Sequence, residues 1–347
     1  MDTLLVLGAL VAVSLAGLAL TTRVLVYRAE RRAPRLGETL NVDGVPLHFT
    51  DTGGGPPVVF VHGAKGSVYD AALSIGPTLA REHRVVAFDR PGAGYSGRAR
   101  VRSGSPLVQA ELLHLALHAL GIRRAVVVAH SAGAPVALAL ALGHPADVAA
   151  VVTLGGYMFS IRDPARAPNR LLTLPVLGTL VRWTVVVPLG LLLSGVVLRH
   201  VFAPDPPDPA YARLAPGLAL RPAHMASDAR DLPDVEEGLR ALAPRYAEIG
   251  TPVVAVHGLA DRVVSAAQAV RLCERVPHAD LVLLEETGHV PHFTRPDAVL
   301  DAVALARRRA GERGTFASPR VPAYTPALVA LGGEPAVPCT RNPLQRG

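Results

Sequence analysis

Two patterns of apolar residues alternate along most of this chain. Short β-branched runs predict strands at Glu38–Val42, Pro46–Asp51, Val58–Val61, Val85–Asp89, Ala125–Val128, Val148–Leu154, Val253–Val256 and Leu281–Leu284. Segments with helical periodicity follow several of them, at Tyr69–Arg81, Leu107–Leu120, Ser265–Val276 and Pro296–Arg309. Strands that alternate with helices are typical of a parallel sheet covered by helices. The sequence therefore predicts an α/β fold with a mostly parallel, doubly wound sheet.

The alternation stops from Tyr157 to about Tyr246, where prolines and short helical runs take over, and it resumes at Thr251. We interpret this segment as a helical cap inserted over the sheet. The expected domain limits are 38–156 for the first part of the core, 157–247 for the cap and 248–310 for the second part. Residues 311–347 are rich in Pro and Gly without periodicity, and are expected to form a disordered tail.

The N-terminal stretch Thr3–Thr22 contains no charged residue and is long enough to span a bilayer as a helix. Only Met1 and Asp2 precede it, so an uncleaved anchor over residues 1–22 is preferred to a signal peptide. Residues 23–37 form a basic juxtamembrane linker. Its arginines place the catalytic domain on the cytoplasmic side by the positive-inside rule: Arg23, Arg28, Arg31, Arg32 and Arg35.

A second apolar stretch, Leu171–Leu198, carries a single charge, Arg182. It is not interpreted as a second span. A membrane crossing there would place Ser131 and His289, the candidate nucleophile and base described below, on opposite sides of the bilayer. Prolines and glycines are expected to break it into short helices of the cap: Pro175, Gly178, Pro188, Gly190 and Gly195. Their apolar faces would cover a lipophilic pocket and lie against the membrane surface; alternatively, the cap would simply pack on its own core.

The strand at Ala125–Val128 passes through a sharp turn at Ser131 into an Ala- and Leu-rich helix. A serine at the tip of such a turn projects its hydroxyl above the sheet. The turn requires small residues two before and two after the serine, and Ala129 and Gly133 stand there. Ser131 is therefore the candidate nucleophile.

A serine hydroxyl needs a base to take its proton, and the base needs an orienting carboxylate. Two loops at the ends of later strands supply these groups. Asp261 follows the strand Val253–Val256, and His289 follows the next strand. Asp89 and Asp163 are rival carboxylates, the former better explained as the structural end of its strand.

The combination of these motifs resembles the α/β-hydrolase fold superfamily over about residues 38–310, apart from the cap. The motifs are His62-Gly63 after a buried strand, the run from Asp89 to Ser96, the turn around Ser131, the run from Gly258 to Asp261, and Gly288-His289. The resemblance implies that Ser131 is the nucleophile, His289 the general base and then acid, and Asp261 its orienting carboxylate. It also implies an oxyanion hole formed by the backbone N–H groups of Ala64 and Ala132. Loop-shaping or pocket roles fall to His62, His130 and His292.

Composition and charge exclude several other classes of function. The formal charge of +7 rests on arginine, since Lys65 is the only lysine, and no basic stripe interleaved with aromatic residues predicts nucleic-acid binding. The two cysteines, Cys273 and Cys339, lie too far apart in sequence for a metal-ligand motif or a disulfide framework. No nucleotide or flavin fingerprint occurs. The sequence therefore predicts neither a metal nor a cofactor.

In the superfamily, members that open epoxides or displace halide carry a carboxylate where this chain has Ser131. The sequence thus favours acyl transfer, with a lipophilic carboxylic ester as the substrate and membrane lipid as a partner of the anchor and the cap. The expected function is that of a membrane-anchored carboxylesterase or an enzyme similar to a monoacylglycerol lipase. Two alternatives stay open: hydrolysis of a non-ester substrate, by carbon–carbon cleavage or perhydrolysis, and a non-catalytic binding homologue.

Overall fold

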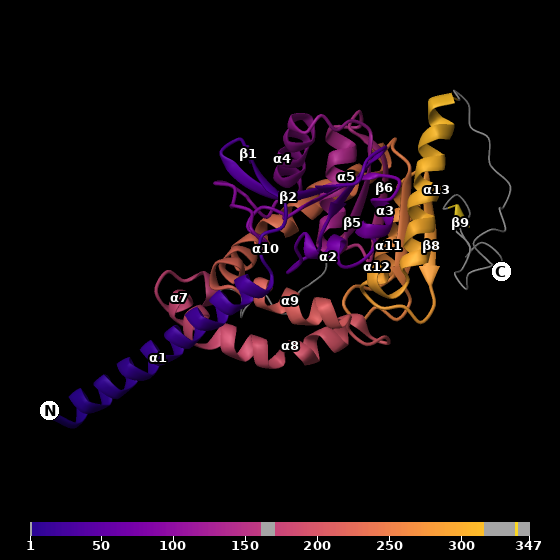
Figure 1. Ribbon diagram of the computed structural model, residues 1–347. Coiled ribbons are helices and arrows are strands. Elements are labelled where there is room, and N and C mark those ends of the chain that lie inside the picture. Colours follow the sequence, from indigo (N-terminus) through magenta and orange to yellow (C-terminus); the bar gives the residue numbers. More distant parts are fainter. Residues whose placement is uncertain (1, 161–170, 316–336, 339–347) are drawn as a thin grey trace.

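The computed structural model describes residues 2–160, 171–315 and 337–338. Its centre is one twisted sheet (Figure 1). The strand order in this sheet is β1–β2–β4–β3–β5–β6–β7–β8–β9. The strands are β1 (Glu38–Val42), β2 (Val45–Thr52), β3 (Pro57–Val61), β4 (Arg84–Phe88), β5 (Ala125–His130), β6 (Val148–Leu154), β7 (Val253–Gly258), β8 (Ala279–Leu284) and β9 (Val337–Pro338). The six strands from β4 to β8 in this order pair in parallel, and the remaining pairings are antiparallel. The prediction of a mostly parallel sheet is confirmed.

Side-chain alternation along the strands creates an apolar core on each face of the sheet. Val59, Val61 and Val127 point into one core, and their neighbours Val58 and Phe60 point into the other. Helices α4 (Pro106–Ala119), α5 (Ala134–Gly143) and α11 (Ala267–Arg275) pack on the first face. Helices α2 (Tyr69–Ala72), α3 (Gly76–Leu79) and α13 (Pro296–Thr315) cover the second.

The strand order reverses at β3, because the chain continues from β3 to β4 on one side and returns to β5 on the other. The chain segments that leave β3 and β5 therefore start side by side, at the carboxyl ends of two adjacent strands, and continue in different directions. Such a switch point opens a crevice where α/β proteins bind their ligands. In this chain it brings the loop after β3 next to the turn at Ser131.

Several expected helices have different limits in the structure. The predicted helix Tyr69–Arg81 is divided into α2 and α3, where Gly76-Pro77 begins a new turn. The C-terminal helix α13 continues to Thr315, six residues beyond Arg309. Val337–Pro338, in the expected tail, pairs with β8 as β9. The rest of that tail after Thr315 lies outside the described residues.

The segment between β6 and β7 forms a helical cap. Its described helices are α7 (Leu177–Val181), the π-helical turn η2 (Arg182–Val186), α8 (Val187–Phe202), α9 (Pro209–Ala219), α10 (Pro222–Leu242) and the 3-10 turn η3 (Ala243–Glu248). The expectation that prolines and glycines divide Leu171–Leu198 into short pieces is wrong for most of that stretch. Residues Leu177–Phe202 form one continuous helix, because Pro188 follows a π-turn and lies in the first turn of α8.

The N-terminal helix α1 (Asp2–Arg32) projects away from the body of the molecule (Figure 1). It exceeds the predicted Thr3–Thr22 by ten residues at its C-terminal end and stops just before Pro34. The last turns of α1 pack on α9, where a Cβ on Gly217 would lie 2.6 Å from the Cβ of Ala29. By length and composition, α1 and the helix Leu177–Phe202 could each cross a membrane.

Candidate active site

The turn between β5 and α5 holds Ser131 in a strained backbone conformation. Ser131 has φ +49°, in the left-handed region that L-residues rarely adopt. The turn fits closely under the end of β3, because a Cβ on Gly133 would lie only 2.5 Å from the carbonyl oxygen of Val61. Ala129 is fully buried. The small residues that the sequence places on both sides of Ser131 are therefore required by packing.

The loop after β3 lies directly on this turn. A Cβ on Gly63 would come within 2.9 Å of the Ser131 Cβ, so only glycine permits this approach. The next residue, Ala64, is exposed, and Ala132 is the second residue of the short 3-10 helix η1 (Ser131–Gly133). Backbone N–H groups at the start of a helix have no partner within it. The predicted oxyanion donors Ala64 and Ala132 thus flank the serine from two loops.

Ser131, His289 and Asp261 are joined in a hydrogen-bonded line. His289 Nε2 lies 3.0 Å from Ser131 Oγ, and His289 Nδ1 lies 2.8 Å from Asp261 Oδ2. The hydroxyl and imidazole residues are nearly enclosed, with 7% of Ser131 and 5% of His289 exposed. The structure brings together the three residues that the sequence analysis selected, from loops after β5, β7 and β8.

Asp261 is held by more groups than the sequence analysis identified. Its Oδ1 accepts hydrogen bonds from the backbone N–H groups of Val263 (2.8 Å) and Val264 (2.9 Å). The buried ring of His257 approaches Oδ2 at 3.1 Å. Burial favours the protonated carboxyl, but the hydrogen bonds from His257, His289 and the backbone outweigh it and lower the pKa of Asp261 well below its usual range. The spacing of His257 and Asp261, four residues apart across a turn, was the available signal for this contact.

The cap and the end of β6 fix the loop that carries His289. The His289 N–H donates to the Val201 carbonyl at 3.3 Å, and a Cβ on Gly288 would lie 2.1 Å from the Ala203 carbonyl oxygen. Gly155, with φ +52°, leaves room for the base, because its Cβ would lie 2.9 Å from the His289 carbonyl oxygen. The position of the imidazole therefore depends on both the core and the cap.

The other three predicted histidines are buried around the site. The His62 ring donates from Nδ1 to the Gly63 carbonyl (2.7 Å) and accepts the Arg90 N–H at Nε2 (2.9 Å), which shapes the loop after β3. Burial is the main cause that lowers the pKa of His62 to about 4. His130 Nε2 donates to the His289 carbonyl at 3.0 Å. His292 packs against His130, with ring centroids 4.7 Å apart. Burial lowers the pKa of His130 well below its usual value and that of His292 to about 3.

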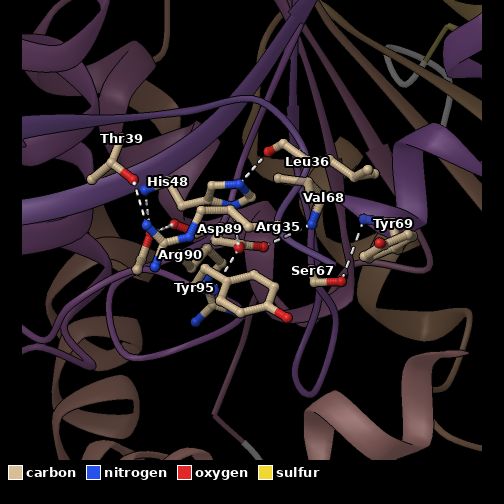
Figure 2. Close-up of polar contacts among 12 residues, drawn as sticks. Arg35, Leu36, Thr39, His48, Ser67, Val68, Tyr69, Asp89, Arg90 and Tyr95 are labelled. Atoms are coloured by element: carbon tan, nitrogen blue, oxygen red, sulfur yellow. Dashed lines mark hydrogen bonds and ion pairs between the residues drawn. The ribbon is translucent and has the colours of Figure 1, made fainter. Parts of the chain in front are cut away.

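The rival carboxylate Asp89 is fully buried and belongs to a separate network (Figure 2). Its Oδ2 accepts from His48 Nδ1 (2.6 Å) and the Tyr95 N–H (2.7 Å), and its Oδ1 accepts from the Val68 N–H (2.8 Å). Asp89 thus braces the segment that follows the loop after β3, as expected for a structural strand end. The other rival, Asp163, lies outside the described residues.

The Asp89 network also holds the end of the N-terminal helix. The hydroxyl of Tyr95 donates to the Ala33 carbonyl at 2.6 Å, and the hydroxyl of Tyr69 donates to the Pro34 carbonyl at 2.7 Å. His48 Nε2 contacts the Leu36 carbonyl (Figure 2). Three of the first four carbonyls after α1 are therefore bound to side chains of this network.

Comparison with known proteins gives a consistent family. Residues 56–296 match the family model described as alpha/beta hydrolase fold. Among curated relatives, the 2-hydroxymuconate semialdehyde hydrolase of Pseudomonas putida is 27% identical over 75% of this chain and 90% of its own. The 2-hydroxy-6-oxo-6-phenylhexa-2,4-dienoate hydrolase of Burkholderia cepacia is 26% identical over 75% and 91%.

Solved structures share the fold at lower identity. A membrane phospholipase A described as a bacterial virulence factor is 24% identical, with a TM-score of 0.62 over 89% of this chain and 98% of its own. A meta-cleavage product hydrolase of Pseudomonas fluorescens IP01 is 20% identical, with a TM-score of 0.59 over 80% and 99%.

Proposed function

Because this chain belongs to the α/β-hydrolase family, we propose that it is a hydrolase with Ser131 as nucleophile, His289 as general base and then acid, and Asp261 as the carboxylate that orients the base. The observation that carries this proposal is the line of hydrogen bonds at 3.0 and 2.8 Å through His289. The same residues argue against the non-catalytic alternative, since a binding homologue needs neither an aligned base nor a strained nucleophile.

The reaction that these groups support begins at a substrate carbonyl. Ser131 Oγ attacks the carbonyl carbon while His289 Nε2 takes the hydroxyl proton, and Asp261 stabilises the imidazolium. The N–H groups of Ala64 and Ala132 would bind the resulting oxyanion. The bond to the leaving group then breaks, and the leaving group takes the proton from His289. Water, deprotonated by the same imidazole, finally releases the acyl group from the serine.

For the substrate, we place carbon–carbon bond hydrolysis first, ahead of the ester expected from the sequence. The curated relatives described above hydrolyse a semialdehyde and a 6-oxo-dienoate by name, and they align over three quarters of this chain. In such substrates a ketone or aldehyde carbonyl offers the electrophile. Once the dienol has tautomerised to its keto form, the carbon next to this carbonyl is saturated, and the bond between them can break to release a resonance-stabilised dienolate, which takes the proton from His289. Ser131 fits this chemistry as well as it fits ester cleavage.

A lipid-derived ester is the second candidate, favoured by one specific observation. The two long apolar helices α1 and Leu177–Phe202 expose large side chains, among them Leu5, Leu10, Leu189, Leu192 and Val196. Side chains of this kind fit a membrane surface. The structural similarity to a membrane phospholipase A extends over 89% of this chain, and at 24% identity it supports a shared fold.

Membrane attachment through α1, with the cap against the lipid and the catalytic domain on the cytoplasmic side, remains part of the proposal. A membrane-embedded helix should keep the full chain in the pellet after an alkaline carbonate wash. Release of the full chain into the wash would remove the anchor from the proposal. If the chain stays in the pellet, protease accessibility in intact and opened cells would test on which side of the membrane the catalytic domain lies.

A direct comparison of substrates tests the reaction class. The full chain in detergent micelles would be assayed with 2-hydroxy-6-oxo-6-phenylhexa-2,4-dienoate and with a series of p-nitrophenyl esters from acetate to palmitate. We expect higher kcat/KM for the dienoate, and no turnover of either by Ser131→Ala. Higher values for long-chain esters would instead favour the lipid candidate. Equal turnover by parent and Ser131→Ala would overturn the serine mechanism itself.

A further inference from the structure

Three buried side chains lie together beside the nucleophile, and in the part of the chain that the structure describes the two histidines among them have ring nitrogens without a hydrogen-bond partner. Asp70, His130 and His292 are all buried, and one donor atom from each lies within 4.8 Å of the other two. Within residues 2–160, 171–315 and 337–338, neither nitrogen of His292 has a hydrogen-bond partner, and neither does Nδ1 of His130. A buried polar group that is left without a partner destabilises the folded protein. The arrangement therefore calls for a missing partner.

The hydrogen bond of His130 defines what this partner must be. The His289 carbonyl only accepts, so the proton of a neutral His130 ring sits on Nε2. Nδ1 is then a bare lone pair, and the absence of a side chain on Gly63 leaves the space before it open. Asp70 adds carboxylate oxygens, held by the Ser67 N–H at 3.4 Å and by the Tyr211 hydroxyl. Each of the three side chains thus offers at least one potential metal-binding atom to the cluster.

We propose that Asp70, His130 and His292 bind one divalent transition-metal ion, for which zinc is the natural choice. Two imidazoles and one carboxylate are ligands that zinc accepts, whereas calcium and magnesium prefer sites made of oxygens. Binding would require the side chains to rotate until the donor atoms lie about 2.0–2.2 Å from the ion. The Tyr211 hydroxyl, already bonded to Asp70, then orients the carboxylate from outside the ligand set.

The ion would act as a structural tie between the loops of the catalytic site. Asp70 follows the loop with Ala64, His130 directly precedes Ser131, and His292 lies three residues after His289. One ion would therefore fix three loops to each other, and Tyr211 would add helix α9 of the cap. The sequence analysis expected no metal, and these ligands are 60 and 162 residues apart in the chain, so they form no motif. Only the fold brings them together.

A second group of metal-binding residues lies on the surface and must be removed from any test. Two overlapping sets share His114: one with Glu111 and His144, the other with His118 and Asp147. Here the imidazoles already bond to carboxylates, as in the 2.8 Å contact of His144 with Glu111. This group needs no ion, but it would collect metal from solution. The substitution His114→Ala disrupts both sets at once.

The experiment measures metal bound by full-length protein produced in zinc-supplemented medium and purified in detergent. All variants carry His114→Ala. Elemental analysis is expected to find one zinc per chain in this background, and at least about a tenfold loss in Asp70→Asn and His292→Phe. Phenylalanine suits the place of His292, which packs against Phe60 and Phe293. Cobalt in place of zinc should give visible absorption bands that disappear in the same variants.

Circular dichroism checks that each variant is folded, and Asp70→Asn serves alone if His292→Phe does not fold. A folded His114→Ala protein with less than about a tenth of an equivalent of metal would overturn the proposal and leave an ordered water as the missing partner. One equivalent that survives both substitutions would also overturn it, because the ion would then be bound elsewhere. Neither readout requires a substrate, so the proposed hydrolase activity is tested separately.

Discussion

His62 accepts the backbone N–H of Arg90 on one ring nitrogen and donates to the carbonyl of Gly63 with the other. This pair of bonds is possible only for the neutral ring, because a second ring proton would face the Arg90 N–H. His62 connects the end of β3 to the end of β4 and so supports the loop that carries Ala64. Its protonation therefore breaks a contact on which the proposed oxyanion hole depends.

We expect this contact to make stability depend on pH. The pKa of His62 is lowered from 6.5 to about 4, so between these values the unfolded chain binds the proton that the folded chain excludes. The contribution of the neutral His62 ring to the free energy of unfolding is present above pH 6.5 and is lost as the pH falls toward 4. From about pH 7.5 to about pH 5, His62 alone accounts for a loss of about 2 kcal/mol. Urea unfolding of His62→Gln should show a correspondingly smaller loss, and identical pH slopes for parent and variant would contradict this account.

Gly155→Ala should impair catalysis more than folding. The new Cβ would lie 2.9 Å from the His289 carbonyl oxygen and 3.2 Å from His289 Nδ1, which displaces the base from Ser131. A shift of about 1 Å in a catalytic group reduces kcat about 100-fold. Gly121→Ala is the matched control, because Gly121 also has a positive φ (+66°) but no atom near its missing Cβ. Both variants carry the strain of an alanine at positive φ, which thermal unfolding measures. Only Gly155→Ala should lose hydrolysis or fluorophosphonate labelling, and Gly121→Ala should keep the parent rate.

Asp261→Asn should impair catalysis and leave folding intact, whereas Asp89→Asn should lower stability and leave catalysis intact. Asn at 261 loses the charge that stabilises the His289 imidazolium, and kcat should fall about 10⁴-fold with the fold retained. Asn at 89 removes an acceptor from a buried network that does not include His289. We expect Asp89→Asn to lower the midpoint of urea unfolding while its folded fraction reacts with fluorophosphonate at the parent rate. A large loss of labelling in folded Asp89→Asn would contradict its structural role and favour Asp89 as a carboxylate of the catalytic site.

Tyr69→Phe and Tyr95→Phe should loosen the connection between α1 and the core. Each removes one hydrogen bond to a carbonyl after α1, worth about 1 kcal/mol. Trypsin should then cut faster at Arg32 or Arg35, on either side of the bound carbonyls. Tyr27→Phe, on the exposed part of α1, is the control and should leave the cleavage rate unchanged. Equal cleavage of all four proteins would mean that these bonds do not hold the segment.

The sequence was a good guide wherever local patterns dictate structure. The β-branched runs predicted the strands within a few residues, because alternate side chains of β3 and β5 must fill cores on both faces of the sheet. The turn at Ser131 was predictable because it requires small residues at fixed positions. Asp261 and His289 could be selected because loops at the carboxyl ends of parallel strands meet at one edge.

The contacts that the sequence did not reveal are those between distant segments. The proximity of His257 to Asp261 depends on how the loop after β7 closes, and that of Asp70, His130 and His292 depends on three separate loops. The prediction that the apolar stretch of the cap breaks into short helices was wrong for a different reason. Proline in the first turn of a helix and a π-turn before it preserve a continuous helix, whereas proline in a helix interior breaks it. Residue type alone does not distinguish these positions.

The hydrogen bonds at the end of α1 change where the catalytic domain begins. A fragment cut after the predicted linker, at residue 38, would lack the carbonyls of Ala33, Pro34 and Leu36 that Tyr95, Tyr69 and His48 bind. Two phenols and one imidazole would lose their acceptors, and His48 is also the partner of Asp89. Together with the packing of Ala29 against Gly217, these bonds place the boundary of the folded unit within the last turn of α1. A soluble version of this enzyme should keep that turn, and low activity in a shorter fragment would report on the cut rather than on the substrate.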